Sequence, residues 1–193
     1  MNLRQHLDAS DLKIGDTTIV ELENFASTLN EWNRIHNLTG ARSMDAIYEN
    51  IIDSIYPMKF IDEPKSLLDV GTGAGFPGMA LAIVYKECQT TLCEPLNKRA
   101  SFLRYVSMEL GLESVTVAKC RVEELHTEPF GLITSRAVTD TKLLLDITSK
   151  VSDDDTQYLF YKGSHLEDEI SSFDNQLNYD IVQRDKRNYL WIK

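Results

Sequence analysis

One loop constrains this chain more than any other segment. An apolar run, Ser66–Val70, passes directly into glycines at every second position, Gly71, Gly73 and Gly75. Glycine lets a backbone turn tightly and lie against a ligand, because no Cβ stands in the way. A helix is expected at 78–85, and the free N–H groups of its first turn face whatever polar group is bound there. The sequence therefore predicts a strand, a loop for a nucleotide-type or amino-acid-type cofactor, and a helix in succession.

Three kinds of cofactor loop fit this segment to different degrees. A phosphate-binding P-loop needs a lysine after its last glycine, and no lysine stands between Lys65 and Lys86. A dinucleotide loop needs a small residue at the sixth position, where Phe76 stands when the count begins at Gly71. The Asp-x-Gly-x-Gly-x-Gly loop of enzymes that bind S-adenosylmethionine (AdoMet) fits at every fixed position. The residues expected to hold AdoMet are Asp69, Gly71, Gly73, Gly75 and Phe76.

A glycine-rich turn that binds nothing is the alternative. Alternating glycines lower stability relative to alanine unless a ligand needs them, so this alternative is disfavoured.

Composition restricts the class of protein further. A chain of 193 residues that is 42% apolar suits one globular domain. The first residues are too polar for a signal peptide, and no apolar run approaches membrane-spanning length. The cysteines are odd in number and lack Cys-x-x-Cys spacing, so neither a disulfide framework nor a metal site is expected. A net charge of −10 does not favour nucleic-acid binding by the whole surface. We expect a monomer in the cytoplasm.

The remaining pattern predicts N-terminal helices followed by a mostly parallel sheet. An apolar stripe from Ile19 to Ile35 predicts a helix over 17–36, and Ser43 begins a second helix that ends before Pro57. From residue 66 onward β-like runs alternate with helical segments, which is typical of βαβ units covered on both faces. The expected strands are 66–70, 90–93, 115–118, 132–134 and 157–161, and the expected helices are 78–85, 97–110 and 140–150.

The last two β-like runs, 179–182 and 189–192, are too close together for a helix between them. They predict an antiparallel hairpin at the edge of the sheet. A parallel sheet ending in such a hairpin is typical of class I AdoMet-dependent methyltransferases, which have a Rossmann-like α/β fold. We expect one methyltransferase domain over 1–193, with a helical extension at 1–62 and an AdoMet-binding α/β core at 63–193.

An acid follows the second expected strand. Glu94 comes directly after Thr91, Leu92 and Cys93, about 20 residues beyond the glycine loop, where an acid can accept hydrogen bonds from both ribose hydroxyls. AdoMet and NAD both offer such a ribose, so Glu94 supports a cofactor pocket without choosing between them. The alternatives are an exposed loop acid and a charge that stabilises the next helix N-terminus.

These motifs resemble the RsmG (GidB) family, in order and with family-like spacing from about residue 17 to the end. They are 32–39 (Trp-Asn-x-x-x-Asn-Leu-Thr), 69–78, 94–99, 121–123, 135–137 and 162–163. The family methylates N7 of one guanine in the 530 loop of 16S ribosomal RNA, using AdoMet. The resemblance implies that Gly71 and Phe76 contact the cofactor, that Val122 and Glu123 lie by its adenine, and that Arg136 lies at its methionine end or at the RNA.

One position departs from the family pattern. The family usually has His-x-x-Asp-Ser in the second helix, and this chain has Asn50-Ile51-Ile52-Asp53-Ser54. An asparagine can keep a hydrogen bond there but cannot transfer a proton.

The expected chemistry needs no general base. Guanine N7 carries a lone pair and no proton, so the enzyme mainly aligns the reactants and tolerates the charge that develops. The chain has neither the Pro-Pro pair of amino-group methylases nor the Pro-Cys pair of cytosine-C5 enzymes. Arg136 is the expected positioning residue, since its guanidinium can grip a carboxylate or a phosphate. An ion pair with a nearby acid is the alternative role for Arg136.

The expected partner is 16S ribosomal RNA in the small ribosomal subunit. The candidate RNA contacts are Arg34, His36, Asn37, Arg42, Lys98, Arg99, Arg121 and Lys162. Two other functions stay open. One is AdoMet-dependent methylation of a small molecule or a protein, and the other is a module that binds AdoMet or a dinucleotide without turnover.

Overall fold

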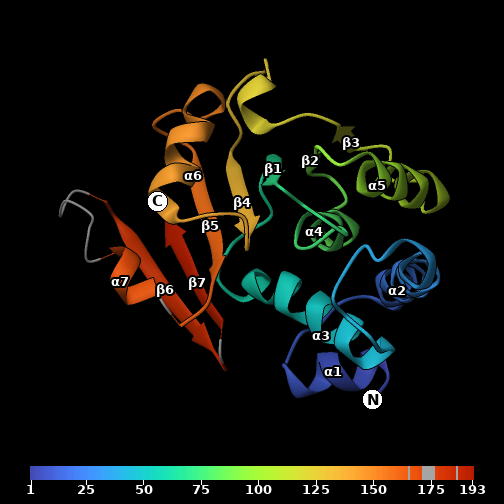
Figure 1. The fold of residues 1–193 in the computed structure, drawn as a ribbon. Coiled ribbons are helices and arrows are strands. Elements are labelled where there is room, and N and C mark those ends of the chain that lie inside the picture. The colour runs from blue at the N-terminus through green and yellow to red at the C-terminus, as the bar shows by residue number, and fades with distance from the viewer. Residues whose placement is uncertain (165, 171–176, 186) are drawn as a thin grey trace.

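The fold is built on a seven-stranded sheet in the order β3-β2-β1-β4-β5-β7-β6 (Figure 1). The computed structural model describes residues 1–164, 166–170, 177–185 and 187–193. The strands are β1 (Ser66–Val70), β2 (Gln89–Cys93), β3 (Val115–Ala118), β4 (Leu132–Arg136), β5 (Gln157–Lys162), β6 (Tyr179–Arg184) and β7 (Arg187–Ile192). The helices are α1 (Leu3–Ala9), α2 (Asp16–His36), α3 (Met44–Ile55), α4 (Gly78–Val84), α5 (Asn97–Glu109), α6 (Thr141–Thr148) and α7 (Leu166–Ile170). Short 3₁₀ turns are η1 (Tyr56–Lys59), η2 (Val122–Glu124) and η3 (Ser149–Val151).

The parallel half of the sheet brings three strand ends to one edge. Val70 of β1 pairs with Cys93 of β2 on one side and with Ser135 of β4 on the other. The loops that leave β1, β2 and β4 must therefore start side by side. This register places the glycine loop, Glu94 and Arg136 together at the carboxyl edge of the sheet, where open α/β sheets bind ligands.

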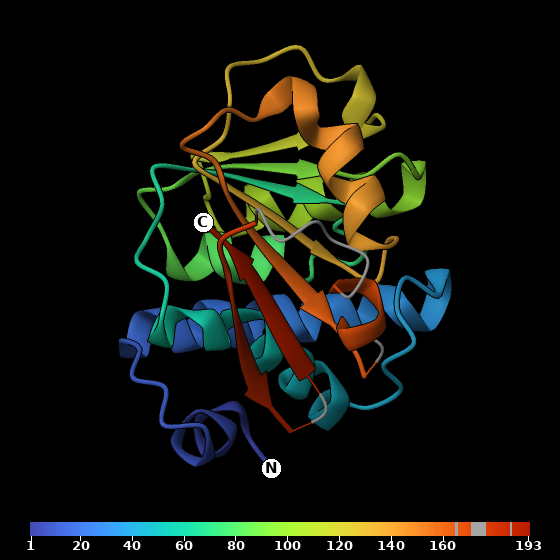
Figure 2. The same cartoon turned by 90° about the vertical axis from the view of Figure 1, so that its left-hand side faces the viewer.

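The antiparallel hairpin is confirmed, with one difference in its detail. β7 lies inside the sheet between β5 and β6, so of the two hairpin strands only β6 is an edge strand. The hairpin strands extend to a pairing of Arg184 with Arg187, which leaves a shorter turn than the sequence indicated. Asp185 takes a left-handed conformation with φ 52°, which allows a tight turn. Figure 2 shows β6 and β7 extending toward the N-terminal helices.

Helices cover both faces of the sheet, as the alternating pattern predicted. One core cluster joins α1, α2 and α3 to α4 and α5, and a second lies under α6 on the other face (Figure 1). Phe25 of α2 is fully buried, with its ring 5.4 Å from that of Phe76 and 6.4 Å from that of Phe102. The helical extension thus packs directly against the glycine loop and α5.

Two details of the N-terminal region differ from expectation. Helix α1 was not expected as a separate element, although Asn2 and Gln5 form a capping box that is readable in the sequence. The stripe on α2 is buried from Ile19 to Leu29, but Ile35 is 75% exposed because it lies in the last turn of the helix, outside the core. Among the described residues, no helix combines the length and apolar character needed to cross a bilayer.

Candidate active site

A cavity of about 420 Å³ lies at the carboxyl edge of the parallel strands. Four segments line it: the loop after α2, the glycine loop, the start of α5 and the end of β4. The predicted site residues that line it are Gly71, Gly73, Phe76, Glu94, Arg99 and Arg136. The structure therefore brings together most of the residues that the sequence assigned to one cofactor pocket.

The glycine loop is a cradle that side chains would obstruct. Gly71, Gly73 and Gly75 all have positive φ, at 67°, 61° and 98°, a conformation that favours glycine. A Cβ on Gly71 would lie 2.6 Å from Val138 Cγ2. A Cβ on Gly73 would have no protein atom nearer than 3.9 Å, so it would project into the cavity. Gly73 therefore keeps open the space that a ligand would fill.

Asp69 supports the loop from below and does not line the cavity. Its carboxylate is fully buried and accepts hydrogen bonds from the Gly78 N–H at 2.8 Å and from the Thr134 hydroxyl at 2.9 Å. Burial raises the pKa of Asp69 to about 6. A Cβ on Gly78 would lie 2.6 Å from the Asp69 Oδ2, so glycine is required at that position too. The carboxylate ties β1 to the start of α4, and a contact of Asp69 with the cofactor stays a prediction.

Gly75 is likewise outside the cavity lining. Its Cβ position faces Met79 Cβ at 2.8 Å and Phe25 Cζ at 3.1 Å. Gly75 therefore lets the loop pack closely against α2 and α4, and its contact with the cofactor stays a prediction.

Glu94 stands on the floor of the cavity and is only 2% exposed. Its Oε2 accepts a hydrogen bond from the Gly73 N–H at 3.0 Å, and its Oε1 accepts one from the Leu96 N–H at 2.8 Å. Arg99 Nη1 lies 3.9 Å from the same Oε2. The carboxylate therefore holds the glycine loop and the start of α5 together. Each carboxylate oxygen can accept more than one hydrogen bond, so capacity remains for ribose hydroxyls.

Arg136 joins the cavity to the N-terminal extension. Its Nη1 donates to Asn50 Oδ1 at 3.0 Å and to Asp53 Oδ2 at 3.1 Å, and its guanidinium lies 5.0 Å from the centroid of the Phe76 ring. The ion pair that was the alternative role for Arg136 is therefore present. Two of its five N–H donors are used in these bonds, and Arg136 still lines the cavity. It can hold Asp53 and a ligand at once.

Asp53 accepts hydrogen bonds from three side chains of two strands, a role that the sequence did not reveal. Besides Arg136, it accepts hydrogen bonds from Arg187 Nε at 2.9 Å and from the Tyr189 hydroxyl at 3.1 Å. Helix α3 thereby connects β4 with the hairpin strand β7. Asn50, at the position where the family usually has histidine, supplies an acceptor to Arg136 and needs no proton to do so. The departure from the family motif was the one sequence signal that pointed to this place.

A wider cavity of about 820 Å³ opens beyond this network. Asn50, Asp53, Arg184 and Arg187 contribute to its walls, and Gly40 lines both cavities. Arg136 therefore stands where the two cavities approach each other.

Val122 and Glu123 do not line the 420 Å³ cavity. Val122 is buried against Cys93 in the core cluster under α6, and Glu123 is exposed in η2. They follow β3 at the carboxyl edge of the sheet, and their assignment to the adenine stays a prediction.

The candidate RNA contacts fall into two groups. Arg34, Asn37, Lys98 and Arg121 are exposed, and Asn37 ends α2 with φ 50°. Lys162 is only 8% exposed, and its Nζ lies 2.7 Å from Glu169 Oε2. The charge of Lys162 is therefore paired and largely buried in this structure, and its contact with RNA stays a prediction.

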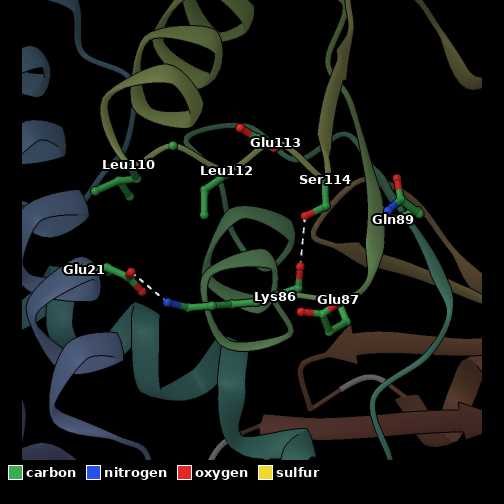
Figure 3. A pocket seen from close by; sticks show the side chains of 9 residues that line it. Glu21, Lys86, Glu87, Gln89, Leu110, Leu112, Glu113 and Ser114 are labelled. Carbon is green, nitrogen blue, oxygen red and sulfur yellow. Dashed lines mark hydrogen bonds and ion pairs between the residues drawn. The ribbon is translucent and has the colours of Figure 1, made fainter.

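A further cavity of about 390 Å³ lies at the opposite edge of the sheet (Figure 3). Gln89, which begins β2, borders it, as does an ion pair between Glu21 and Lys86 at 2.7 Å. This cavity is separated from the glycine loop by the length of the strands. It does not share residues with the candidate active site.

Comparisons with known proteins agree with this geometry. The GidB family model, described as rRNA small subunit methyltransferase G, matches residues 18–189. A ribosomal RNA small subunit methyltransferase G from Aliarcobacter butzleri is 47% identical over 191 residues, which are 99% of this chain and 98% of that protein.

Solved structures show the same fold. A methyltransferase from Geobacter sulfurreducens has a TM-score of 0.64 at 11% identity, over 99% of this chain and 94% of that one. Coclaurine N-methyltransferase, bound to N-methylheliamine and SAH, has a TM-score of 0.55 at 20% identity, over 83% of this chain and 55% of that one. The expected class I methyltransferase fold is confirmed.

Proposed function

Since this chain belongs to the GidB family, rRNA small subunit methyltransferase G, we propose that it methylates N7 of a guanine in the 530 loop of 16S ribosomal RNA, with AdoMet as methyl donor. Family membership confirms the resemblance drawn from the motifs and establishes an rRNA methyltransferase. The choice of base and atom is the proposal. The observation that carries it is a cavity that Arg136 lines, with no cysteine, histidine, lysine or aspartate among its lining residues, and whose one acid, Glu94, accepts hydrogen bonds from the backbone of Gly73 and Leu96.

The cavity suits AdoMet by its shape and its polar groups. Gly73 leaves open space where any side chain would intrude, and Glu94 offers carboxylate oxygens for a ribose. Bound AdoMet supplies a methyl group on a positively charged sulfur. The ring of Phe76, beneath the Arg136 guanidinium, gives the cavity an apolar wall.

Arg136 has a positioning role in this proposal. Asn50 and Asp53 fix one side of its guanidinium, which leaves the remaining N–H donors for the methionine carboxylate or for an RNA phosphate. In the reaction a bond forms between guanine N7 and the methyl carbon while the bond from that carbon to sulfur breaks. The positive charge passes from sulfur to the purine, and no proton moves. Alignment is therefore the main task of these residues.

The test uses small ribosomal subunits that lack the modification, incubated with the protein and methyl-labelled AdoMet. We expect label in one nucleotide of the 530 loop, recovered as 7-methylguanosine after digestion. Label on another RNA atom would overturn the N7 assignment. Label only in protein or in small molecules, or tight binding of AdoMet without turnover, would favour one of the two other functions.

A further inference from the structure

Two segments of this acidic chain combine several cations with an absence of aspartate and glutamate. They are 32–44, between Glu31 and Asp45, and 95–108, between Glu94 and Glu109. The lysines and arginines of these segments are Arg34, Arg42, Lys98, Arg99 and Arg104. In a chain with a net charge of −10, this distribution concentrates positive charge locally.

The fold places the two segments side by side. Trp32 of α2 packs against Phe102 and Tyr105 of α5, with ring centroids 5.5 Å and 5.4 Å away. At the far end of the same pair, Thr28 donates to Glu109 at 3.1 Å. The helices therefore run antiparallel, with the C-terminus of α2 beside the N-terminus of α5, and Figure 1 shows both on one side of the molecule.

A cation directly after β3 joins this region, since Lys119 Nζ donates to Asn97 Oδ1 at 3.3 Å. Asn97 begins α5. We define the basic face by its cations, which are Arg42, Lys98, Arg99 and Lys119.

The basic face borders the cofactor cavity directly. Leu38 and Gly40, from the first acid-free segment, line the cavity together with Leu96 and Arg99 from the second. A chain that lies across this face would therefore pass the mouth of the cavity.

Most charges of the basic face are not neutralised by the protein. Within the described part of the chain, Arg42, Lys98 and Lys119 form no ion pair with a carboxylate, whereas basic residues elsewhere often do. Examples of such pairs are Arg4 with Asp16, Lys59 with Asp11, Lys86 with Glu21 and Lys193 with Asp180. The basic face thus offers free positive charge to a polyanion.

Flat and apolar side chains are exposed among these cations. Tyr105 is 39% exposed and Leu96 is 56% exposed, and Ile35 in the last turn of α2 is 75% exposed. The His36 ring lies 5.4 Å from that of Trp32. Cations interleaved with aromatic rings are typical of surfaces that bind single-stranded nucleic acid, where phosphates meet the cations and bases stack on the rings.

We propose that the basic face docks the RNA strand that flanks the target nucleotide, with its phosphates on the cations and one base stacked on Tyr105. This inference rests on the proposed function and adds the surface by which RNA approaches the site. A strand held there delivers its unstacked nucleotide to the cavity through the gap between the loop after α2 and the start of α5.

The test measures binding of an RNA oligonucleotide containing the 530 loop across a salt series. The variants are Arg42→Ala, Lys98→Ala, Tyr105→Ala and Tyr105→Phe, with Lys142→Ala and Lys150→Ala as controls. Both control lysines are exposed, at α6 and η3 on the other face of the sheet. Affinity for AdoMet, measured on the same samples, shows that each variant is folded.

We expect Arg42→Ala and Lys98→Ala each to reduce the slope of log K against log salt by about 0.7, the value for one phosphate contact on a single strand. Tyr105→Ala is expected to weaken binding roughly tenfold, and Tyr105→Phe to bind as the wild type does, since stacking needs only the ring. The control variants keep the wild-type slope.

Three results would overturn the docking surface. They are unchanged salt slopes in both cation variants, slope reductions of the same size in the control variants, and no binding of the oligonucleotide by the wild type. Methyl transfer to the oligonucleotide or the subunit separates this failure from that of the proposed function. A wild type that methylates the 530 loop while the cation variants bind normally refutes the surface alone. A wild type that binds through this face but methylates another atom refutes the N7 assignment alone.

Discussion

Two glycines of the same loop stand in different surroundings, and alanine at each should have a different effect. A Cβ on Gly73 faces the cavity, with no protein atom nearer than 3.9 Å. A Cβ on Gly75 would lie 2.8 Å from Met79 Cβ and 3.1 Å from Phe25 Cζ. Both glycines have positive φ, so alanine at either carries a backbone cost of about 1–2 kcal/mol. What separates the two variants is the contact that the new methyl group makes.

Gly75→Ala should mainly destabilise the protein. Its overpacked methyl group costs about 1–3 kcal/mol in addition to the backbone cost, which gives a total loss of about 2–5 kcal/mol in the free energy of unfolding. For a chain of this length that loss lowers Tm by about 4–20 °C. Gly73→Ala should carry only the backbone cost of about 1–2 kcal/mol, which lowers Tm by about 2–8 °C.

Gly73→Ala should mainly weaken AdoMet binding, because its methyl group enters the space of the ligand. A steric cost of about 1–3 kcal/mol corresponds to roughly 5- to 150-fold in affinity. Calorimetry with AdoMet and its demethylated product, alongside urea unfolding of the same samples, measures both effects. A folded Gly73→Ala protein with wild-type affinity would refute the assignment of the loop. A Gly75→Ala protein as stable as Gly73→Ala would refute the packing argument.

Three further changes probe the residues around the cavity. Asn50→His should make the rate of methyl transfer decrease as the pH drops below about 6.5, because a protonated imidazole cannot accept the Arg136 hydrogen bond. A pH profile identical to that of the wild type would contradict this. Asp53→Asn should lower the free energy of unfolding by about 2 kcal/mol. This is less than the loss of a fully buried ion pair would cost, because Arg136 and Arg187 are partly exposed. Urea denaturation that shows no change would contradict this prediction. The pKa of Asp69 is raised to about 6 from 3.8, so the folded state binds the proton more tightly than the unfolded state does. The contribution of Asp69 to the free energy of unfolding therefore decreases by about 3 kcal/mol as the pH rises from about 4 to 7. Asp69→Asn should lack that decline, and unfolding curves in which the difference between the two proteins is constant with pH would count against it.

Local patterns predicted the centre of the fold closely. The expected strands at 66–70 and 115–118 match β1 and β3, and the helices at 17–36 and 97–110 match α2 and α5 within one residue at each end. Hydrophobic period and glycine spacing act over a few residues, so they can be read from the sequence. Gly71, Gly73 and Glu94 were assigned to one pocket because carboxyl ends of neighbouring parallel strands meet at one edge.

Contacts between distant segments were beyond such patterns. Arg136 meets Asn50 and Asp53 from 86 and 83 positions away, and no local signal selects one acid among many. Lys162 is an ordinary lysine in sequence, but the fold buries it beside Glu169. Asp69 belongs to the cofactor motif, yet its carboxylate supports the loop because the chain turns over it to form α4.

The sequence by itself determined that a strand, a glycine cradle and a helix form a cofactor loop in a parallel sheet, because backbone freedom and hydrophobic period are local properties. Only the tertiary structure decided which charges stay free. Arg136, Lys162 and Arg187 are held by acids brought from other elements, whereas Lys98 and Lys119 are left exposed on either side of Asn97. Charge pairing depends on distances between side chains that are remote in the chain, and those distances exist only after the helices have packed on the sheet.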